Sequence, residues 1–147
     1  MDDRLKTLVT DRLRDAGFGV TRPRLAVAET LYKLGGHQTA DEVHIGLVKR
    51  DVLMPRTSVY NALAALSAAG VVCTADIGPG PVVYELENGW HHHFVCRRCG
   101  RVRDVSCKAG EKPCLTPQEN VGEIDEAQVI FRGVCADCLA EPDGETA

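Results

Sequence analysis

Apolar residues recur at helical spacing at the start of the chain. Over positions 3–16, charged residues alternate with Leu5, Leu8, Val9 and Leu13. This pattern is typical of an amphipathic helix that buries one apolar face. We therefore expect a first helix across this segment.

Capping signals delimit two further helices. Thr21 can cap a helix whose first turn holds Pro23, and the pair Gly35–Gly36 ends it. Thr39 and Glu42 then stand three residues apart, the spacing of a capping box, in which each side chain satisfies a backbone N–H group. The helix that this box opens carries the apolar residues Val43, Ile45, Leu47 and Val48.

A fourth helix is predicted from about residue 56 to residue 69. Val59, Leu63 and Leu66 would lie on its buried face, and Gly70 would end it. Two runs of strand-forming residues follow, GVVCTADI and VVYELE, separated by the turn GPGP. Helices followed by such a hairpin predict a winged helix-turn-helix, in which the last helix reads the major groove of DNA and the hairpin forms the wing.

Beyond residue 88 the pattern changes to short strands. The segments HHFVC, RVRDV and QVIFRGVC are typical of strands, and this half holds few apolar residues for its length. Small domains with a poor core often depend on a structural metal. The prediction is an α+β protein with a winged-helix DNA-binding domain over 1–87, a small α/β metal-binding dimerisation domain over 88–140 and a flexible tail over 141–147.

Composition and charge narrow the class of protein. The 147 residues are 44% hydrophobic and 26% charged, and no apolar run is long enough to cross a membrane, so a cytoplasmic protein with no membrane contact is expected. The net charge of −4 speaks against DNA binding, because phosphate contacts need positive charge. The charge is uneven, however: residues 1–69 hold ten Lys and Arg against eight Asp and Glu, and the rest of the chain holds seven against thirteen.

Four of the seven cysteines form two Cys-x-x-Cys pairs, Cys96 with Cys99 and Cys135 with Cys138. In a reducing compartment this spacing indicates a metal before disulfides, and four thiolates suit a closed, tetrahedral Zn(II) site. Unrelated buried cysteines and thioredoxin-type redox pairs are the alternatives. Neither pair opens a helix in a βαβ unit, as a thioredoxin motif does, so we predict a structural zinc.

The histidine triplet needs another role, because zinc bound by four cysteines has no open position. On a strand, residues two apart face the same side, so His91 and His93 point together and His92 points away. Two imidazoles on one face suit a divalent transition metal. A solvated surface patch would have the same sequence, and spacing alone does not gather further ligands.

The order of these motifs resembles the ferric uptake regulator (Fur) superfamily of dimeric, metal-dependent, winged-helix repressors. The resemblance rests on VTRPRLAVAETL, GGHQTADEV, RTSVYNALAALSAAGVV, YELENGWHHHFVCRRCG and GVCADC, which run over nearly the whole chain. Within the superfamily the chain looks most like the peroxide-sensing branch, including the actinobacterial regulators of catalase genes. The segments CKAGEKPCLTP and DEAQVIFRGVCADC carry that likeness.

The resemblance implies roles for individual residues. A regulatory Fe(II) or Mn(II) would be bound by His37, Glu85, His91, His93 and Asp104. The structural Zn(II) would be bound by Cys96, Cys99, Cys135 and Cys138. In a homodimer on a double-stranded, inverted-repeat operator, we expect DNA contacts from Arg22, Arg24, Arg56, Thr57, Ser58, Tyr60 and Asn61.

The resemblance also predicts the signal. The repressor would bind DNA when the regulatory site is filled and leave it when peroxide oxidises a metal-bound histidine, His37 or His91. The alternative is a repressor that senses iron dosage without peroxide chemistry. Glu85 stands where peroxide sensors typically have aspartate and iron-responsive members often have glutamate, whereas Asp104 and the spacing from Glu85 to Cys96 fit the peroxide branch.

The remaining candidate residues have weaker signals. Cys107 and Cys114 could form an accessory redox pair or be loop thiols with no role, and Cys73 is expected to be a small core residue. No histidine follows His93, which argues against a third metal site of the kind that many members of the superfamily have. An enzyme is not expected, because no motif such as HExxH joins an open zinc site to a general base.

Overall fold

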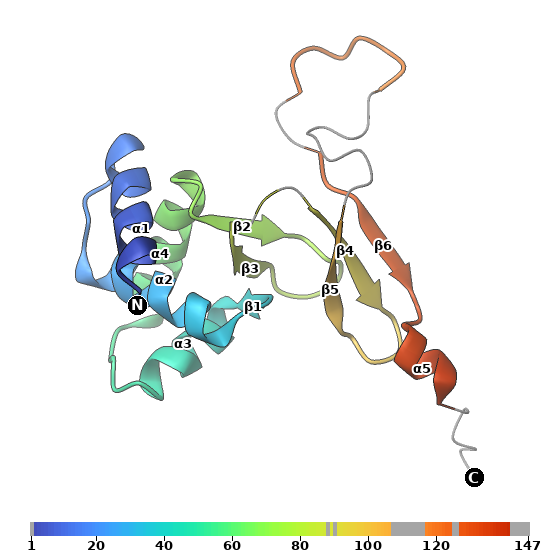
Figure 1. The fold of residues 1–147 in the computed structure, drawn as a ribbon, viewed down its shortest axis with the longest axis horizontal. Coiled ribbons are helices and arrows are strands. Elements are labelled where there is room, and N and C mark those ends of the chain that lie inside the picture. Colours follow the sequence, from blue (N-terminus) through green and yellow to red (C-terminus); the bar gives the residue numbers. More distant parts are fainter. Residues whose placement is uncertain (1, 88, 90, 107–116, 125–126, 142–147) are drawn as a thin grey trace. The chain divides into compact units, whose positions relative to one another are not determined.

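The computed structural model describes residues 2–87, 89, 91–106, 117–124 and 127–141 (Figure 1). The chain divides into two compact units, residues 1–88 and 89–147, each with its own buried cluster. The described elements are α1 (Asp3–Asp15), α2 (Arg22–Leu34), β1 (Gln38–Thr39), α3 (Ala40–Val48), α4 (Arg56–Ala68), β2 (Val72–Ala75), β3 (Val83–Leu86), β4 (His91–Cys96), β5 (Val102–Ser106), β6 (Ile130–Gly133) and α5 (Ala136–Ala140). The α+β fold class is confirmed.

The helices α1 to α4 bury one apolar cluster in the N-terminal unit. Each contributes residues three or four apart, the spacing that places side chains on one face of a helix. The least exposed members of this cluster are Val9, Leu13, Val27, Ala28, Leu31, Val43, Leu47, Val59, Ala62, Leu63 and Leu66. Their burial is the main force that holds the four helices together.

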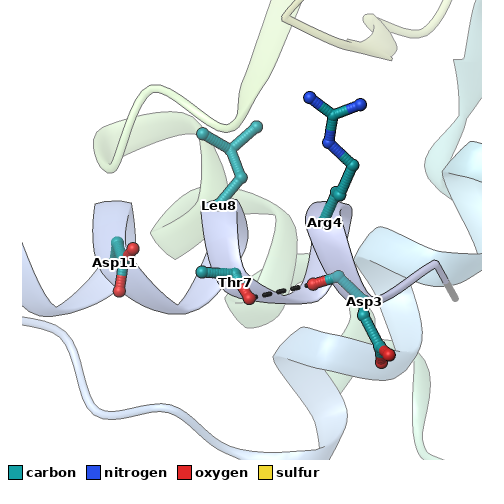
Figure 2. Close-up of a pocket in the computed structure, with 5 residues that line it drawn as sticks. All are labelled: Asp3, Arg4, Thr7, Leu8 and Asp11. Atoms are coloured by element: carbon teal, nitrogen blue, oxygen red, sulfur yellow. Dashed lines mark hydrogen bonds between the residues drawn. The ribbon is translucent and has the colours of Figure 1, made fainter.

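Three apolar residues of the predicted helices lie on the surface instead. Leu8, Ile45 and Val48 are 44%, 49% and 45% exposed. The helix α1 packs mainly through Val9 and Leu13, which are four residues apart and share a face. Figure 2 shows the outer face of α1, formed by Asp3, Arg4, Thr7, Leu8 and Asp11. The buried stripe of α1 is therefore narrower than the sequence pattern predicts.

Both helices start where the capping signals predict, with Thr21 at the N-cap of α2 and Thr39 at the N-cap of α3, but only α3 has the side-chain hydrogen bonds. At α3 the capping box forms, with the Thr39 amide donating to Glu42 Oε2 at 2.7 Å and the Glu42 amide donating to Thr39 Oγ1 at 3.2 Å. At α2 the side chain of Thr21 makes no capping hydrogen bond. Pro23 marks that helix start because proline suits the first turn, where its missing N–H costs no intrahelical bond.

The strands of the N-terminal unit form an antiparallel sheet in the order β1-β3-β2. The β2–β3 hairpin is the predicted wing, with Cys73 directly opposite Glu85. The two-residue strand β1 pairs with the other edge of β3 and is not predicted from the sequence. Cys73 is half-buried and its thiol contacts the Glu87 carboxylate, so the expectation of a core residue is wrong.

In the C-terminal unit the sheet has the order β5-β4-β6, with β5 antiparallel and β6 parallel to the central strand. The buried cluster among the described residues of this unit consists of Cys96, Cys135 and Cys138, with Phe94 packed against them. So small an apolar core is consistent with stabilisation by a metal. Neither unit has, within its described residues, a helix with the length and apolar content needed to span a bilayer.

Candidate functional site

Four cysteines converge in the C-terminal unit. Cys96 ends β4, Cys99 lies in the turn that follows, and Cys135 and Cys138 flank the start of α5. The four sulfur atoms all lie within 4.8 Å of one another. Cys96 Sγ is 3.9 Å from Cys138 Sγ, and Cys99 Sγ is 3.8 Å from Cys135 Sγ.

These separations fit a tetrahedral metal and exclude disulfides. Zinc–sulfur bonds of about 2.3 Å in a tetrahedron place the sulfur atoms about 3.8 Å apart. A disulfide would need about 2.05 Å between them. The four thiol groups thus match Zn(II) in donor type, number and spacing.

Cys96 and Cys138 differ in acidity. Backbone amides of Cys99 and Cys135 donate to Cys96 Sγ at 3.5 and 3.3 Å, and these hydrogen bonds lower the pKa of Cys96 to about 6. Hydrogen bonding with the neighbouring thiols, Cys135 foremost, and burial raise the pKa of Cys138 to about 12. The site therefore stabilises a thiolate at Cys96 even before a metal compensates the charge.

Two arginines that the sequence does not single out hold the segment of Cys135 and Cys138. The Arg98 guanidinium donates to the carbonyl oxygen of Cys138, and Arg101 Nη1 lies 2.5 Å from Asp137 Oδ2. Both come from the turn between β4 and β5, whereas Cys138 and Asp137 belong to α5. The only sequence signal for this role is that both arginines lie within two residues of Cys99.

The N-terminal unit contains two of the five predicted regulatory ligands, and the structure brings these two together. His37 Nε2 lies 3.3 Å from Glu85 Oε2. The register of β1 with β3 explains the contact: Gln38 pairs with Tyr84, so His37 is next in line opposite Glu85. An imidazole nitrogen and a carboxylate oxygen from distant segments thereby form a two-donor group.

The C-terminal unit contains the other three. His91 and His93 lie on the same side of β4, with ring centroids 4.9 Å apart, and His93 is directly opposite Asp104 on β5. His91 Nε2 is 3.8 Å from Asp104 Oδ1. His92 faces the other way, toward the ring of Phe131. The alternation of the triplet is thus as the strand period predicts.

The donor chemistry of each group suits the same kinds of ion. Imidazole nitrogen combined with carboxylate oxygen is a set for Fe(II), Mn(II) or Zn(II). In the C-terminal group one donor atom from each of His91, His93 and Asp104 lies within 4.8 Å of the other two, a spacing that one ion can bridge. Neither group includes a thiol, which distinguishes both from the four-cysteine site.

The predicted DNA-contacting residues lie on α2 and α4. Arg22, Arg56, Thr57, Tyr60 and Asn61 are exposed, and Arg24 and Ser58 are half-buried. Arg24 is held within its own unit, because Nη1 donates to the Gly19 carbonyl at 2.5 Å and the guanidinium stacks on Phe18.

A crevice of about 240 Å³ separates α4 from the wing. It is lined by Thr39, Ala40, Asp41, Tyr60, Pro81, Val82 and Tyr84. Tyr60 of the predicted recognition helix is thus close to wing residues. The candidate redox residues Cys107 and Cys114 lie outside the described residues.

The sequence matches the model of the ferric uptake regulator family over residues 15–128. The chain belongs to the ferric uptake regulator family. Membership places it among metal-dependent transcriptional regulators, which are not enzymes. It confirms the superfamily, and it does not by itself assign the chain to the peroxide-sensing branch.

Relatives and solved structures agree with this membership. The chain is 43% identical over 132 residues to the transcriptional regulator FurA of Mycobacterium tuberculosis, covering 87% of this chain and 88% of the relative. It is 44% identical over 139 residues to ferric uptake regulation protein 2 of Mycolicibacterium fortuitum, covering 88% and 92%. The ferric uptake regulator of Pseudomonas aeruginosa, solved with manganese, matches with a TM-score of 0.70 at 26% identity and covers 86% of this chain and 97% of that structure.

Proposed function

We propose that this chain is a homodimeric repressor that binds inverted-repeat DNA operators when a divalent metal fills its regulatory site. The observation that carries the proposal is the division of donor groups between the units. His37 and Glu85 form one group, and His91, His93 and Asp104 form the other. We propose that both groups bind a single ion.

The mechanism is a shift in population. An ion that needs donors from both units binds only those arrangements of the units in which all donors converge, and it stabilises them by its differential affinity. In a dimer this arrangement sets the distance between the two α4 helices, which read half-sites about one helical turn apart. Loss of the ion releases the arrangement and, with it, the operator.

The metals are assigned by donor type. Zn(II) at Cys96, Cys99, Cys135 and Cys138 would be structural, since four thiolates leave no open position. Fe(II) or Mn(II) is proposed for the regulatory site, because imidazole with two carboxylates favours harder ions than thiolate does. The Pseudomonas aeruginosa structure with manganese supports this choice.

The DNA interface is proposed on the first two turns of α4. Contacts with the major groove would come from Arg56, Thr57, Ser58, Tyr60 and Asn61, with Arg22 and Arg24 near phosphates or a minor groove. Most of these side chains are exposed, as such contacts require. Residues 1–69 hold more positive than negative side chains, which supports a DNA-binding surface on this part of the chain.

Iron dosage is the signal that we favour. The relatives named as ferric uptake regulation proteins match over most of the chain. By resemblance, Glu85 stands where iron-responsive members of the family often have glutamate. In this reading the concentration of free Fe(II) sets the occupancy of the site, and no covalent change is needed.

Peroxide sensing is the second candidate, supported by Asp104 and by the spacing from Glu85 to Cys96, which both resemble the peroxide-sensing branch. Bound Fe(II) would donate an electron to peroxide, and Mn(II) does not readily do so. His37 and His91 are the histidines proposed to be oxidised. Peroxide treatment of the Fe(II) form should then add oxygen to one of them and abolish DNA binding, while the Mn(II) form stays active.

Mobility-shift assays on iron-uptake-type and catalase-type promoters test the function. We expect the unmodified chain to bind DNA when Mn(II) is added and to release it when a chelator is added. The variants His37→Ala and His91→Ala should not bind DNA even with Mn(II). His92→Gln is the matched control, since this neighbour faces the opposite side of β4. Metal-independent binding by the unmodified chain would refute the proposal, and release by peroxide but not by iron limitation would favour the second candidate.

A further inference from the structure

The start of the proposed recognition helix is paired with a carboxylate from the preceding helix. Arg56 Nη1 lies 2.6 Å from Asp41 Oδ1. Both side chains are more than half exposed, at 61% and 56%. An exposed ion pair of this kind contributes little to stability and exchanges readily. The pair lies at the start of the helix that is proposed to contact DNA, so we consider a role in DNA binding.

The amino end of α4 is otherwise suited to bind anions. Pro55 at the N-cap provides no side-chain hydrogen bond, and the first turn contains no acidic residue. A helix start carries partial positive charge from its unsatisfied N–H groups, and the Arg56 guanidinium adds a full charge there. A DNA phosphate and the Asp41 carboxylate are therefore chemically equivalent partners for this end of the helix.

Asp41 is not required to cap its own helix. The capping box of α3 is formed by Thr39 and Glu42, which exchange hydrogen bonds with each other's backbone amides. Within the described part of the chain, Asp41 pairs with Arg56, fifteen residues away. The packing of α3 on α4 has separate support from the buried Val43, Leu47 and Leu63 and from the contact between His44 Nε2 and the Met54 carbonyl at 3.2 Å.

We infer that Asp41 competes with DNA phosphate for Arg56 and thereby limits sequence-independent binding. The inference rests on the proposed function, because it assumes that α4 contacts DNA. In the free protein the Asp41 carboxylate neutralises the Arg56 guanidinium. When Arg56 moves to a DNA phosphate, the DNA releases a cation but Asp41 attracts one, so the net release of counterions is small. An approaching phosphate must displace the carboxylate, and binding that lacks other favourable contacts is weakened most.

A double-mutant cycle on the full Mn(II)-loaded chain tests this competition. Asp41→Asn, Arg56→Gln and the double variant are titrated by fluorescence anisotropy against a duplex of scrambled sequence of about 30 base pairs, at about 50 to 200 mM salt. Asp41→Asn should bind this duplex about threefold to tenfold more tightly at the lowest salt. Its salt dependence should steepen by about one unit in a plot of log affinity against log salt.

The Arg56→Gln background separates competition from simple repulsion. There, Asp41→Asn should change affinity by less than about twofold, because the residue it acts through is gone. An equal gain in both backgrounds would mean that Asp41 merely repels phosphate, and the inference would be wrong. Asp11→Asn, which removes the same charge from α1, is the control and should have no effect; a gain equal to that of Asp41→Asn would also overturn the inference. If the unmodified chain binds no duplex with Mn(II), the proposed function itself fails.

Discussion

Cys96 accepts hydrogen bonds from two backbone amides, and its acidity differs from that of Cys138 for that reason. The contacts from Cys99 and Cys135 favour the thiolate and lower the pKa of Cys96 to about 6. A lowered pKa in the folded state stabilises the metal-free fold above the ordinary pKa of about 9.0, and this contribution is lost as pH falls through about 6. Cys96 should therefore be ready to bind a metal at a lower pH than Cys138.

Ultraviolet absorbance of thiolate, titrated in zinc-free, reduced protein, tests this asymmetry without requiring the buried sulfur atoms to react with a reagent. The absorbance that belongs to Cys96 should appear with a midpoint near pH 6, whereas Cys138, whose pKa is raised to about 12, should contribute none at neutral pH. Comparison with Cys96→Ser and Cys138→Ser assigns the signal to the two sites. Equal loss of absorbance in both variants at pH 7 would show that the amide hydrogen bonds do not persist without metal.

Gly46 is fixed by close packing between α3 and α2. A Cβ at this position would lie 2.9 Å from Thr30 Cγ2 and 3.0 Å from Leu34 Cδ1. Thr30 is fully buried and stiff at χ1, so it cannot move aside cheaply. The absent side chain is therefore what lets the two helices approach.

Gly46→Ala should lower the free energy of unfolding by about 1 to 2 kcal/mol, since overpacking outweighs the gain of about 1 kcal/mol in helix propensity. Urea denaturation measures the change. Gly19→Ala is the control, because its Cβ would meet only Arg24 Nη1 at 3.8 Å, and it should be near neutral. A stabilised Gly46→Ala variant would contradict the packing argument.

At the scale of elements, the shortest strand has the largest consequence for the candidate regulatory site. The strand β1 is two residues long, yet its pairing with β3 aligns His37 with Glu85. Local pattern cannot predict a strand of this length, because two residues carry no alternation to detect. The histidine in the GGHQTADEV segment has its partner only because this register exists.

The helix α5 is likewise defined by its contacts. With five residues it is too short to be stable alone, and Cys135 at its N-cap makes no side-chain hydrogen bond. Arg98 donates to the carbonyl oxygens of Cys138 and, at 3.5 Å, Glu141, which anchors the carboxyl end of α5. The second cysteine pair is therefore positioned by a residue that is not itself one of the candidate zinc ligands.

Arg98→Met should speed zinc transfer to a chromogenic chelator by about tenfold, because losing a residue that orients metal ligands weakens the site. Arg97→Met removes an exposed charge from the same turn and serves as the control, with an unchanged rate expected. Stopped-flow absorbance gives both rates. Similar rates for the two variants would assign the effect to charge rather than to the contact with α5.

For the whole molecule, the two metal sites should differ in retention. Four thiolates enclose one site, whereas the proposed regulatory ion has only nitrogen and oxygen donors and depends on two separate units. We therefore expect zinc to stay bound under conditions that remove the regulatory ion.

Dialysis against a mild chelator should remove Mn(II) or Fe(II) and abolish DNA binding while about one zinc per chain remains, since thiolate sites bind Zn(II) most strongly. Elemental analysis by mass spectrometry and a mobility shift on the same sample measure both. Added Mn(II) should restore binding. Loss of zinc together with the regulatory ion would argue against two independent sites.

The sequence by itself determined the features that depend on residues near one another in the chain. The buried face of α4, the capping box of α3, the alternation of the histidine triplet and each Cys-x-x-Cys pair follow from local spacing. Spacing of three, four or two residues fixes direction in a helix or strand without reference to the rest of the fold. The fold class follows from the order of these elements.

Only the tertiary structure decided which distant side chains meet. The contact of His37 with Glu85, of Asp41 with Arg56 and of Arg98 with α5 joins segments whose relative position depends on strand register and helix packing. The exposure of Leu8 has the same origin, because a helix buries only the part of its apolar stripe that finds a neighbour. Such contacts arise from the free energy of the whole packed unit, which no local pattern encodes.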